Sequence, residues 1–405
     1  MMRKSSLLPV VCLLLAAACS GPGPGGERLN VLLVTLDTTR ADHLGCYGYP
    51  LPTSPNLDRL AADGILFDLA ISTSGITPIS HASIFTGMNP DRHGLRVFYG
   101  EAGHYLDPAH PTLATILKSR SFRTGAFISA YPASERFGLH HGFDTFSTGV
   151  SDEVMTGDPR LRPPKDGYWM DRRTASAQRR ADATTDEALA WLDQPADGGN
   201  PFLLWVHYFD PHDPSLVPPE EINSKFGADS RTPDALLKIY DPEIFFMDSQ
   251  FGRLISRLKE TGQYDNTLIV VVGDHGQGLG DHNWFPHRLL YQEQIRVPLI
   301  VRLPGAYQGA KVGALARTTD ILPTVLERLG IESPEAVQGL NLEPILAGTS
   351  REQRVGMAEA LNTLDAHAPA GLPPHQQDLL FMAMDRKWKL IHHVNQPGND
   401  ELYNL

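Results

Sequence analysis

The segment Thr77-Pro78-Ile79-Ser80-His81-Ala82-Ser83-Ile84-Phe85-Thr86-Gly87 predicts a helix over Ser80–Thr86, with a hydroxyl and a proline at its first turn. Proline fits that turn because the first helical N–H groups have no partner inside the helix. Those N–H groups and the partial positive charge of the helix end favour an anion beside Thr77. Taken alone, Thr77 is equally consistent with a residue that only caps the helix. Other segments of the sequence are needed to distinguish an anion site beside Thr77 from a simple helix cap.

Short apolar runs alternate with longer amphipathic segments outside this stretch. We predict buried strands at Val31–Leu36, Gly125–Ser129, Phe202–Val206, Leu268–Val272 and Pro298–Val301. We predict further helices at Asn56–Asp63, Thr112–Ser119, Ala177–Leu192, Ile244–Thr261 and Asp320–Leu329. This alternation indicates an α/β fold, with a doubly wound, mostly parallel sheet and helices on both of its faces.

Polar residues stand at the carboxyl ends of three predicted strands. Asp37 and His207 directly follow such apolar runs, and Asp274 directly follows Leu268–Gly273. In open α/β sheets, sites form beyond the carboxyl ends of the strands. We therefore expect a functional site at this edge, and we interpret His207 as a structural residue at a strand end.

The quoted segment resembles the signature of the sulfatase family, within the alkaline-phosphatase superfamily. In that signature a Cys or Ser, matured to formylglycine, is followed by x-Pro-Ser-Arg and then by Thr-Gly. With Thr86-Gly87 aligned on the final pair, Thr77 takes the nucleophile position. Thr77, Ile79 and His81 depart from the family's Cys or Ser, Pro and Arg, which puts formylglycine in doubt. An unmodified Thr resembles the nucleophile of other superfamily branches, such as phosphodiesterases and phosphoethanolamine transferases.

Two further segments resemble the metal-binding parts of the same family. Asp37 lies in a segment where the family usually has two adjacent carboxylates, and Thr38 takes the second place. Asp274-His275-Gly276, followed by Leu279-Gly280-Asp281-His282, resembles the other segment. The resemblance implies one divalent cation bound by Asp37, Thr77, Asp274 and His275. Three oxygens and one nitrogen suit Zn²⁺ or Mn²⁺, and Ca²⁺ stays open.

The same resemblance implies catalytic roles for three histidines. His287 stands where the family usually has a Lys that grips the sulfate. His212 matches a His near the leaving-group oxygen, so we expect an acid or substrate-binding role, with a surface residue as the alternative. His81 is expected to orient Thr77 or contact the substrate anion, and a helix-surface His is the alternative.

Three more residues are predicted to lie close to the substrate. Arg288 follows His287, His282 matches a family position, and Asp210 shares the segment of His212. Asp210 and His212 are also the candidate ligands of a second metal, as in the two-metal branches of the superfamily.

These assignments predict a metal-dependent hydrolase that cleaves sulfate or phosphate esters through Thr77, with phosphate mono- and diesters favoured. A true arylsulfatase-type enzyme and a phosphoethanolamine-type transferase are alternatives within the same class. A non-catalytic binding protein with this fold is the alternative from a different class. The expected substrate is a small molecule or a glycan or lipid ester, and the sequence sets no oligomeric state.

Composition and organisation agree with an enzyme of one large domain. The 405 residues, 41% of them hydrophobic, can bury a large core. The formal charge of −12 argues against non-specific binding of nucleic acid. We predict a catalytic domain over 29–345 and a small C-terminal antiparallel sheet over 346–405, short or incomplete relative to the family. Long loops are expected at Thr148–Asp171, Pro211–Pro233 and Asn362–Gln377.

The first residues resemble a bacterial lipoprotein signal. Residues 1–18 contain the apolar run Leu7–Ala18, which is too short to span a bilayer. Leu15-Ala16-Ala17-Ala18-Cys19 looks like a lipobox, so we expect a lipid on Cys19 and a tether over 19–28; plain secretory cleavage is the alternative. Ser20 then implies an envelope lipoprotein of the outer membrane, facing the periplasm or cell surface. Only Cys46 remains beyond this region, so no intramolecular disulfide is expected.

Overall fold

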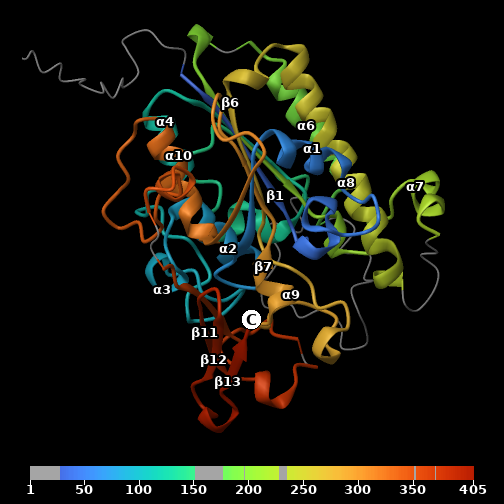
Figure 1. Cartoon of the computed structure of the whole chain (residues 1–405), viewed down its shortest axis with the longest axis vertical. Helices are drawn as coiled ribbons and strands as arrows, with labels where there is room; N and C mark the ends of the chain where they lie inside the picture. Colours follow the sequence, from blue (N-terminus) through green and yellow to red (C-terminus); the bar gives the residue numbers. More distant parts are fainter. Residues whose placement is uncertain (1–27, 151–176, 196, 228–234, 351–352, 370) are drawn as a thin grey trace, which may run out of the picture.

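Figure 1 shows a computed structural model of the chain, which describes residues 28–150, 177–195, 197–227, 235–350, 353–369 and 371–405. The predicted signal peptide and Cys19 lie outside these residues, as does most of the predicted loop Thr148–Asp171. None of the helices in the described parts is long and apolar enough to cross a membrane.

The main sheet has nine strands. They are β1 (Asn30–Leu36), β2 (Ile65–Ile71), β3 (Arg123–Ile128), β4 (Thr145–Ser147), β5 (Phe202–Tyr208), β6 (Thr267–Gly273), β7 (Arg296–Val297), β8 (Leu299–Arg302) and β9 (Ala310–Arg317). Their order is β4-β3-β5-β1-β6-β8-β2-β7, with β9 paired to β2. The strands from β4 to β6 run parallel, as do β2 and β9, whereas β8 is antiparallel to β6 and β2, and β7 to β2. The predicted mostly parallel sheet is confirmed.

Helices cover both faces of this sheet. They are α1 (Pro55–Asp63), α2 (Thr77–Thr86), α3 (Pro90–His93), α4 (Leu113–Ser119), α6 (Ala181–Leu192), α7 (Glu220–Lys225), α8 (Ala235–Glu260), α9 (Gln292–Ile295), α10 (Ile321–Arg328) and α11 (Glu343–Leu346). Leu32 and Val34 of β1 join one hydrophobic core with residues of α1, α6 and α8. Val31 and Leu33 join a second core with α2, α4 and α10. Because successive residues of a strand face opposite sides, β1 contacts both helical layers, as expected for a doubly wound fold.

The helix that decides the fold is wholly buried. α2 begins after Ile76, which is its N-cap residue, so Thr77 lies inside the first turn and does not cap the helix. It ends at Gly87, whose φ of 66° is left-handed and whose N–H donates to the carbonyl of Ser83. Glycine adopts that conformation without the steric penalty of a side chain, which explains the Thr-Gly ending.

Several predicted boundaries were wrong. α8 begins at Ala235 rather than at Ile244, because Pro242 lies inside the helix instead of ending it. The loop expected over Pro211–Pro233 contains α7, while 228–234 lie outside the described residues. β2 and β9 were not predicted, and β9 is mostly half-exposed, so it lacks the continuous apolar run of a buried strand.

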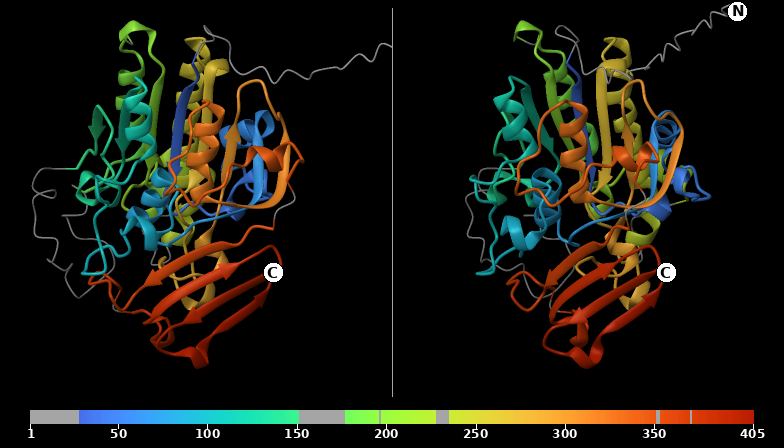
Figure 2. Two further views of the ribbon diagram at one scale, coloured as in Figure 1. Left: turned by 90° about the vertical axis from the view of Figure 1, so that its left-hand side faces the viewer. Right: turned by 60° about the vertical axis from the view of Figure 1, so that its left-hand side comes forward.

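A separate four-stranded antiparallel sheet follows the main domain. It consists of β10 (Gly356–Leu361), β11 (Leu379–Met384), β12 (Trp388–His393) and β13 (Glu401–Asn404), in that order. Figure 2 shows this sheet at one end of the molecule, while β1 begins near the opposite end. Ala358, Leu380 and Ile391 pack against Ile71 and Leu315 of the main sheet. The small C-terminal sheet predicted from the sequence is therefore present.

Candidate active site

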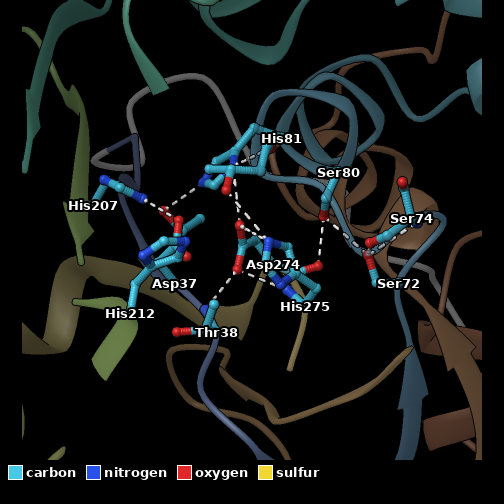
Figure 3. A network of polar contacts seen from close by, with 12 residues as sticks. Asp37, Thr38, Ser72, Ser74, Ser80, His81, His207, His212, Asp274 and His275 are labelled. Atoms are coloured by element: carbon cyan, nitrogen blue, oxygen red, sulfur yellow. Dashed lines mark hydrogen bonds and ion pairs between the residues drawn. The ribbon is translucent and has the colours of Figure 1, made fainter. Parts of the chain in front are cut away.

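Two carboxylates and one imidazole meet at the carboxyl ends of β1 and β6. Asp37 and Asp274 directly follow these neighbouring parallel strands, in which Leu36 pairs with Gly273. Ligand atoms of Asp37, Asp274 and His275 lie within 4.8 Å of one another, and all three residues are fully buried. Figure 3 shows their side chains converging below the first turn of α2. The structure thus brings together three of the four predicted metal ligands in one group.

Thr77 completes this group. Its Oγ1 lies 3.3 Å from Nε2 of His275, and its hydroxyl partly offsets the rise that burial causes in the pKa of Asp37. Only 2% of Thr77 is exposed. Because Ile76 is the cap residue, the hydroxyl is available to the carboxylates, and the interpretation of Thr77 as a helix cap was wrong.

The electrostatics of the group fit a divalent cation. Burial raises the pKa of Asp37 and of Asp274 well above the usual range, and for Asp274 the neighbouring Asp37 adds to the effect. Oδ1 of Asp37 and Oδ2 of Asp274 are buried without a hydrogen-bond partner. Nδ1 of His275 lies 3.0 Å from the carbonyl of Gly276, which can only accept, so Nδ1 carries the proton and Nε2 offers its lone pair. Two orphaned carboxylate oxygens and one imidazole nitrogen are a donor set suited to Zn²⁺ or Mn²⁺.

Backbone and hydroxyl groups fix Asp274. Its Oδ1 accepts the N–H groups of His275 at 2.7 Å and Thr38 at 3.2 Å. Oγ of Ser80, one turn into α2, donates to the carbonyl of Asp274 at 2.6 Å. Thr38 adopts a φ of 49°, which is unusual for a β-branched residue and marks strain at this site. Thr38, in the place of the family's second carboxylate, therefore contributes its backbone N–H to Asp274.

His81 supports α2 from inside the protein. It is fully buried, so the alternative of a helix-surface histidine was wrong. Its Nδ1 lies 2.8 Å from the carbonyl of Thr77 and 3.6 Å from Oδ2 of Asp274. Its Nε2 lies 3.0 Å from Oγ1 of Thr35.

His212 and His287 face each other beside His275. Their Nε2 atoms are 3.2 Å apart, and the rings of His287 and His275 are 4.5 Å apart. Nδ1 of His287 lies 2.6 Å from the carbonyl of Gly75, so its proton is on Nδ1. The proton between the two Nε2 atoms therefore belongs to His212. Burial lowers the pKa of His212 to about 3 and that of His287 well below the usual range, so both rings are neutral at pH 7.

The remaining predicted residues make their contacts elsewhere. Arg288 is buried and pairs with Asp365 at 2.6 Å, although its charge contributes to lowering the pKa of His287. His282 is exposed and stacks on Tyr291 with ring centroids 3.7 Å apart. Asp210 accepts the Ala181 N–H at the start of α6. Within the described residues, neither Asp210 nor His212 joins a group of three ligands close enough to hold a second metal.

His207 contacts this group, although we interpreted it as a structural residue at a strand end. Its Nε2 lies 3.1 Å from Oδ2 of Asp37, and burial lowers its pKa to about 3. The signal that could have found it is the order of strands, because β5 lies next to β1.

Comparison with known proteins places this geometry in a family. A sequence profile described as sulfatase matches residues 29–331, and one described as N-sulphoglucosamine sulphohydrolase, C-terminal, matches residues 280–405. An N-acetylglucosamine-6-O-sulfatase of Bacteroides thetaiotaomicron is 23% identical over 98% of this chain and 84% of its own length. An arylsulfatase of Clostridium perfringens is 27% identical over 78% of each chain.

Solved structures show the same fold. A phosphonate monoester hydrolase from Silicibacter pomeroyi superposes with a TM-score of 0.67 and 24% identity, over 93% of this chain and 89% of that one. The profile match alone spans well over half of the sequence. This chain therefore belongs to the sulfatase family of ester hydrolases.

Proposed function

We propose that this protein hydrolyses phosphate mono- or diesters with unmodified Thr77 as the nucleophile. The observation that carries the proposal is the Thr77 hydroxyl, which lies at the N-terminus of α2, 3.3 Å from Nε2 of His275, and which acts to lower the pKa of the Asp37 carboxylate. Asp37, Asp274, His275 and Thr77 would hold one divalent cation. Such a cation lowers the pKa of a bound hydroxyl and polarises the ester.

The preference for phosphorus follows from the chemistry of threonine. The hydrate of formylglycine has two hydroxyls, and the second expels sulfate as the aldehyde reforms. Thr77 has a single hydroxyl, so a sulfated Thr77 would be released only by direct attack of water or another acceptor. Phosphoryl enzymes turn over through direct attack of that kind. Unmodified Thr77 is therefore better suited to the hydrolysis of phosphate esters than of sulfate esters.

The residues of the chain supply the rest of the first step. Oγ of Thr77 forms a bond to phosphorus as the bond to the leaving oxygen breaks, and the hydroxyl proton is released to water. The positive end of α2 stabilises the developing charge on Oγ and on the non-bridging oxygens. His212 protonates the leaving oxygen. Since burial keeps His212 neutral, its imidazolium has to form as the anionic substrate binds beside it.

Water completes the cycle. It attacks the phosphorus of phosphothreonine 77 and gives one proton to His212, while the Oγ–P bond breaks and Oγ recovers its proton. With another alcohol in place of water, the same step would be a phosphoryl transfer of the phosphoethanolamine-transferase type. The likeness to a phosphonate monoester hydrolase supports phosphorus chemistry on this fold. The named relatives are sulfatases, and sulfate hydrolysis is the rival function.

A substrate panel tests the proposal. Protein loaded separately with Zn²⁺, Mn²⁺ and Ca²⁺ would be given aryl phosphate, aryl phosphodiester, phenylphosphonate ester and aryl sulfate with the same leaving group. We expect faster turnover of a phosphorus ester than of the sulfate, and unmodified threonine at residue 77 by mass spectrometry. Robust sulfate turnover with little phosphorus activity would restore the sulfatase reading, and no turnover with bound metal would favour a binding protein.

A further inference from the structure

We propose that His207 is a positioning residue of the metal centre, whose Nε2–H holds Oδ2 of Asp37 so that Oδ1 is the oxygen offered to the cation. This inference rests on the metal centre proposed above and is independent of which ester is cut. Its basis is a row of hydrogen-bonded groups along the carboxyl edge of the sheet.

The row follows the strand order β3-β5-β1-β6. Ser129 follows β3, His207 lies near the end of β5, and Asp37 and Asp274 follow β1 and β6. The parallel registers pair His207 with Ile128 on one side and with Thr35 on the other. These four residues therefore lie within two residue positions of one another at the carboxyl edge of the sheet, and Figure 3 shows His207 aimed at Asp37.

The protonation of His207 is fixed by its partner on β3. The backbone N–H of Ser129 donates to Nδ1 of His207 at 3.4 Å. Since an amide nitrogen can only donate there, Nδ1 is the acceptor and the proton of the neutral ring is on Nε2. Nε2–H then donates to Oδ2 of Asp37 at 3.1 Å. Ser129 thus selects the tautomer that suits a carboxylate.

This contact leaves Asp37 with one engaged and one free oxygen. Oδ2 is held by His207, whereas Oδ1 is buried without a hydrogen-bond partner. Asp274 has the same division, but two backbone N–H groups hold its Oδ1. Outer partners of this kind orient metal ligands, and their loss typically costs about 10- to 100-fold in metal affinity. The carboxylate of Asp37 is oriented by a side chain, so substitution of His207 tests whether this orientation affects metal binding.

A packing role is the competing explanation. The His207 ring lies 5.1 Å from His81, 6.2 Å from Trp205 and 6.1 Å from Phe209, measured between centroids. Substitutions therefore have to separate the lost donor from the lost ring. His207→Gln places an N–H near the position of Nε2, His207→Asn places one near Nδ1, and His207→Leu supplies bulk without a donor.

The experiment measures the dissociation constants of Zn²⁺ and Mn²⁺ by competition with a chelator, on the full-length protein and these variants. We expect His207→Leu and His207→Asn to bind metal about 10- to 100-fold more weakly, and His207→Gln to stay within about threefold of the wild type. His93→Gln is the matched control, because His93 is also buried and hydrogen-bonded, but to Ser83. It should leave metal affinity unchanged.

Thermal melting of the metal-free proteins shows whether each variant is folded. Wild-type affinity in His207→Leu would overturn the inference, and so would equal losses in the folded Gln and Asn variants. If His207→Leu does not fold, the Gln and Asn pair still decides. Nitrogen NMR of the wild type offers a second measurement, in which a proton on Nδ1 of His207 would also overturn it. Absence of metal binding by the wild type would refute the proposed function and this inference together. The wild type is therefore measured first, before any variant is compared.

Discussion

Replacing the Thr77 hydroxyl should separate its chemical role from its packing role. Thr77→Val keeps the shape of the side chain and removes only the hydroxyl, together with its contact to Nε2 of His275. We expect kcat on aryl phosphate esters to fall by at least about 10³-fold, which is roughly 4 kcal/mol of transition-state stabilisation.

Thr77→Ser is the informative counterpart, because it keeps the oxygen. A Thr in a helix divides between two χ1 wells, whereas Ser can occupy three. Populating three wells in place of two lowers kcat by about 1.5-fold, or roughly 0.2 kcal/mol. Since Thr77 is 2% exposed, loss of its methyl group should also lower the free energy of unfolding by about 1 kcal/mol.

The assay is steady-state turnover of the matched esters, with bound metal measured in every sample. Acid quenching followed by mass spectrometry should trap phosphothreonine at residue 77 in the wild type and phosphoserine in Thr77→Ser. A metal-loaded Thr77→Val protein with more than a tenth of wild-type activity would refute Thr77 as the nucleophile. So would a Thr77→Ser protein as inactive as Thr77→Val.

Two further expectations concern regions away from the nucleophile. Burial lowers the pKa of His93 to about 3. Between pH 6.5 and 3, His93 is therefore protonated in the unfolded chain but neutral in the folded protein. Relative to His93→Gln, the wild type should therefore lose roughly 1.4 kcal/mol of unfolding free energy per pH unit between pH 6.5 and 3, as urea titrations at several pH values would show. For the predicted lipobox, Cys19→Ala should yield protein that is unprocessed or soluble. Cell fractionation and labelling with a radioactive fatty acid would measure this. Unlipidated wild-type protein beginning after Ala18 would contradict a lipid anchor.

The sequence predicted the central strands because their signals are local. Val31–Leu36 is apolar except for Thr35, as expected of a strand that is covered on both faces, and all of β1 is buried. Asp37 and Asp274 were expected at one edge of the sheet because each lies where such a run ends, but their role as ligands came from the resemblance to the sulfatase family. The position of Thr77 depended on the resemblance around Thr86-Gly87, since helix periodicity alone could not separate a nucleophile from a cap.

What the sequence did not predict depends on contacts between distant segments. Arg288 was assigned to the substrate because it follows His287, but its guanidinium pairs with Asp365, 77 residues further along the chain. His207 was assigned a structural role because a strand-end histidine has no local sign of its partner. The contact of His207 with Asp37 depends on the order of the strands β5, β1 and β6. No single segment of the sequence contains that order.

The charge of the site predicts which phosphorus ester is preferred. A divalent cation would balance Asp37 and Asp274, His287 is neutral, and the imidazolium that forms on His212 as the substrate binds adds one positive charge. The nearby charge of Arg288 is balanced by buried Asp365. No Lys or Arg of the described residues forms a hydrogen bond or ion pair with any of the four predicted ligands. Such a site suits a monoanion, so phosphodiesters should be cut faster than phosphomonoesters at pH 7.5.

Acidity provides the test of this charge argument. A phosphomonoester has a second pKa near 6, so its monoanionic fraction rises about 25-fold between pH 7.5 and pH 5.5. The ratio of kcat/KM for monoester over diester should rise by a similar factor, and the diester corrects for titration of the protein itself. His287→Lys restores the cation usual in the family and should raise monoester turnover selectively at pH 7.5. A ratio that does not change with pH, together with no gain in His287→Lys, would show that the charge of the transferred group does not decide specificity. In that case the choice between the two esters would lie in contacts to their organic parts.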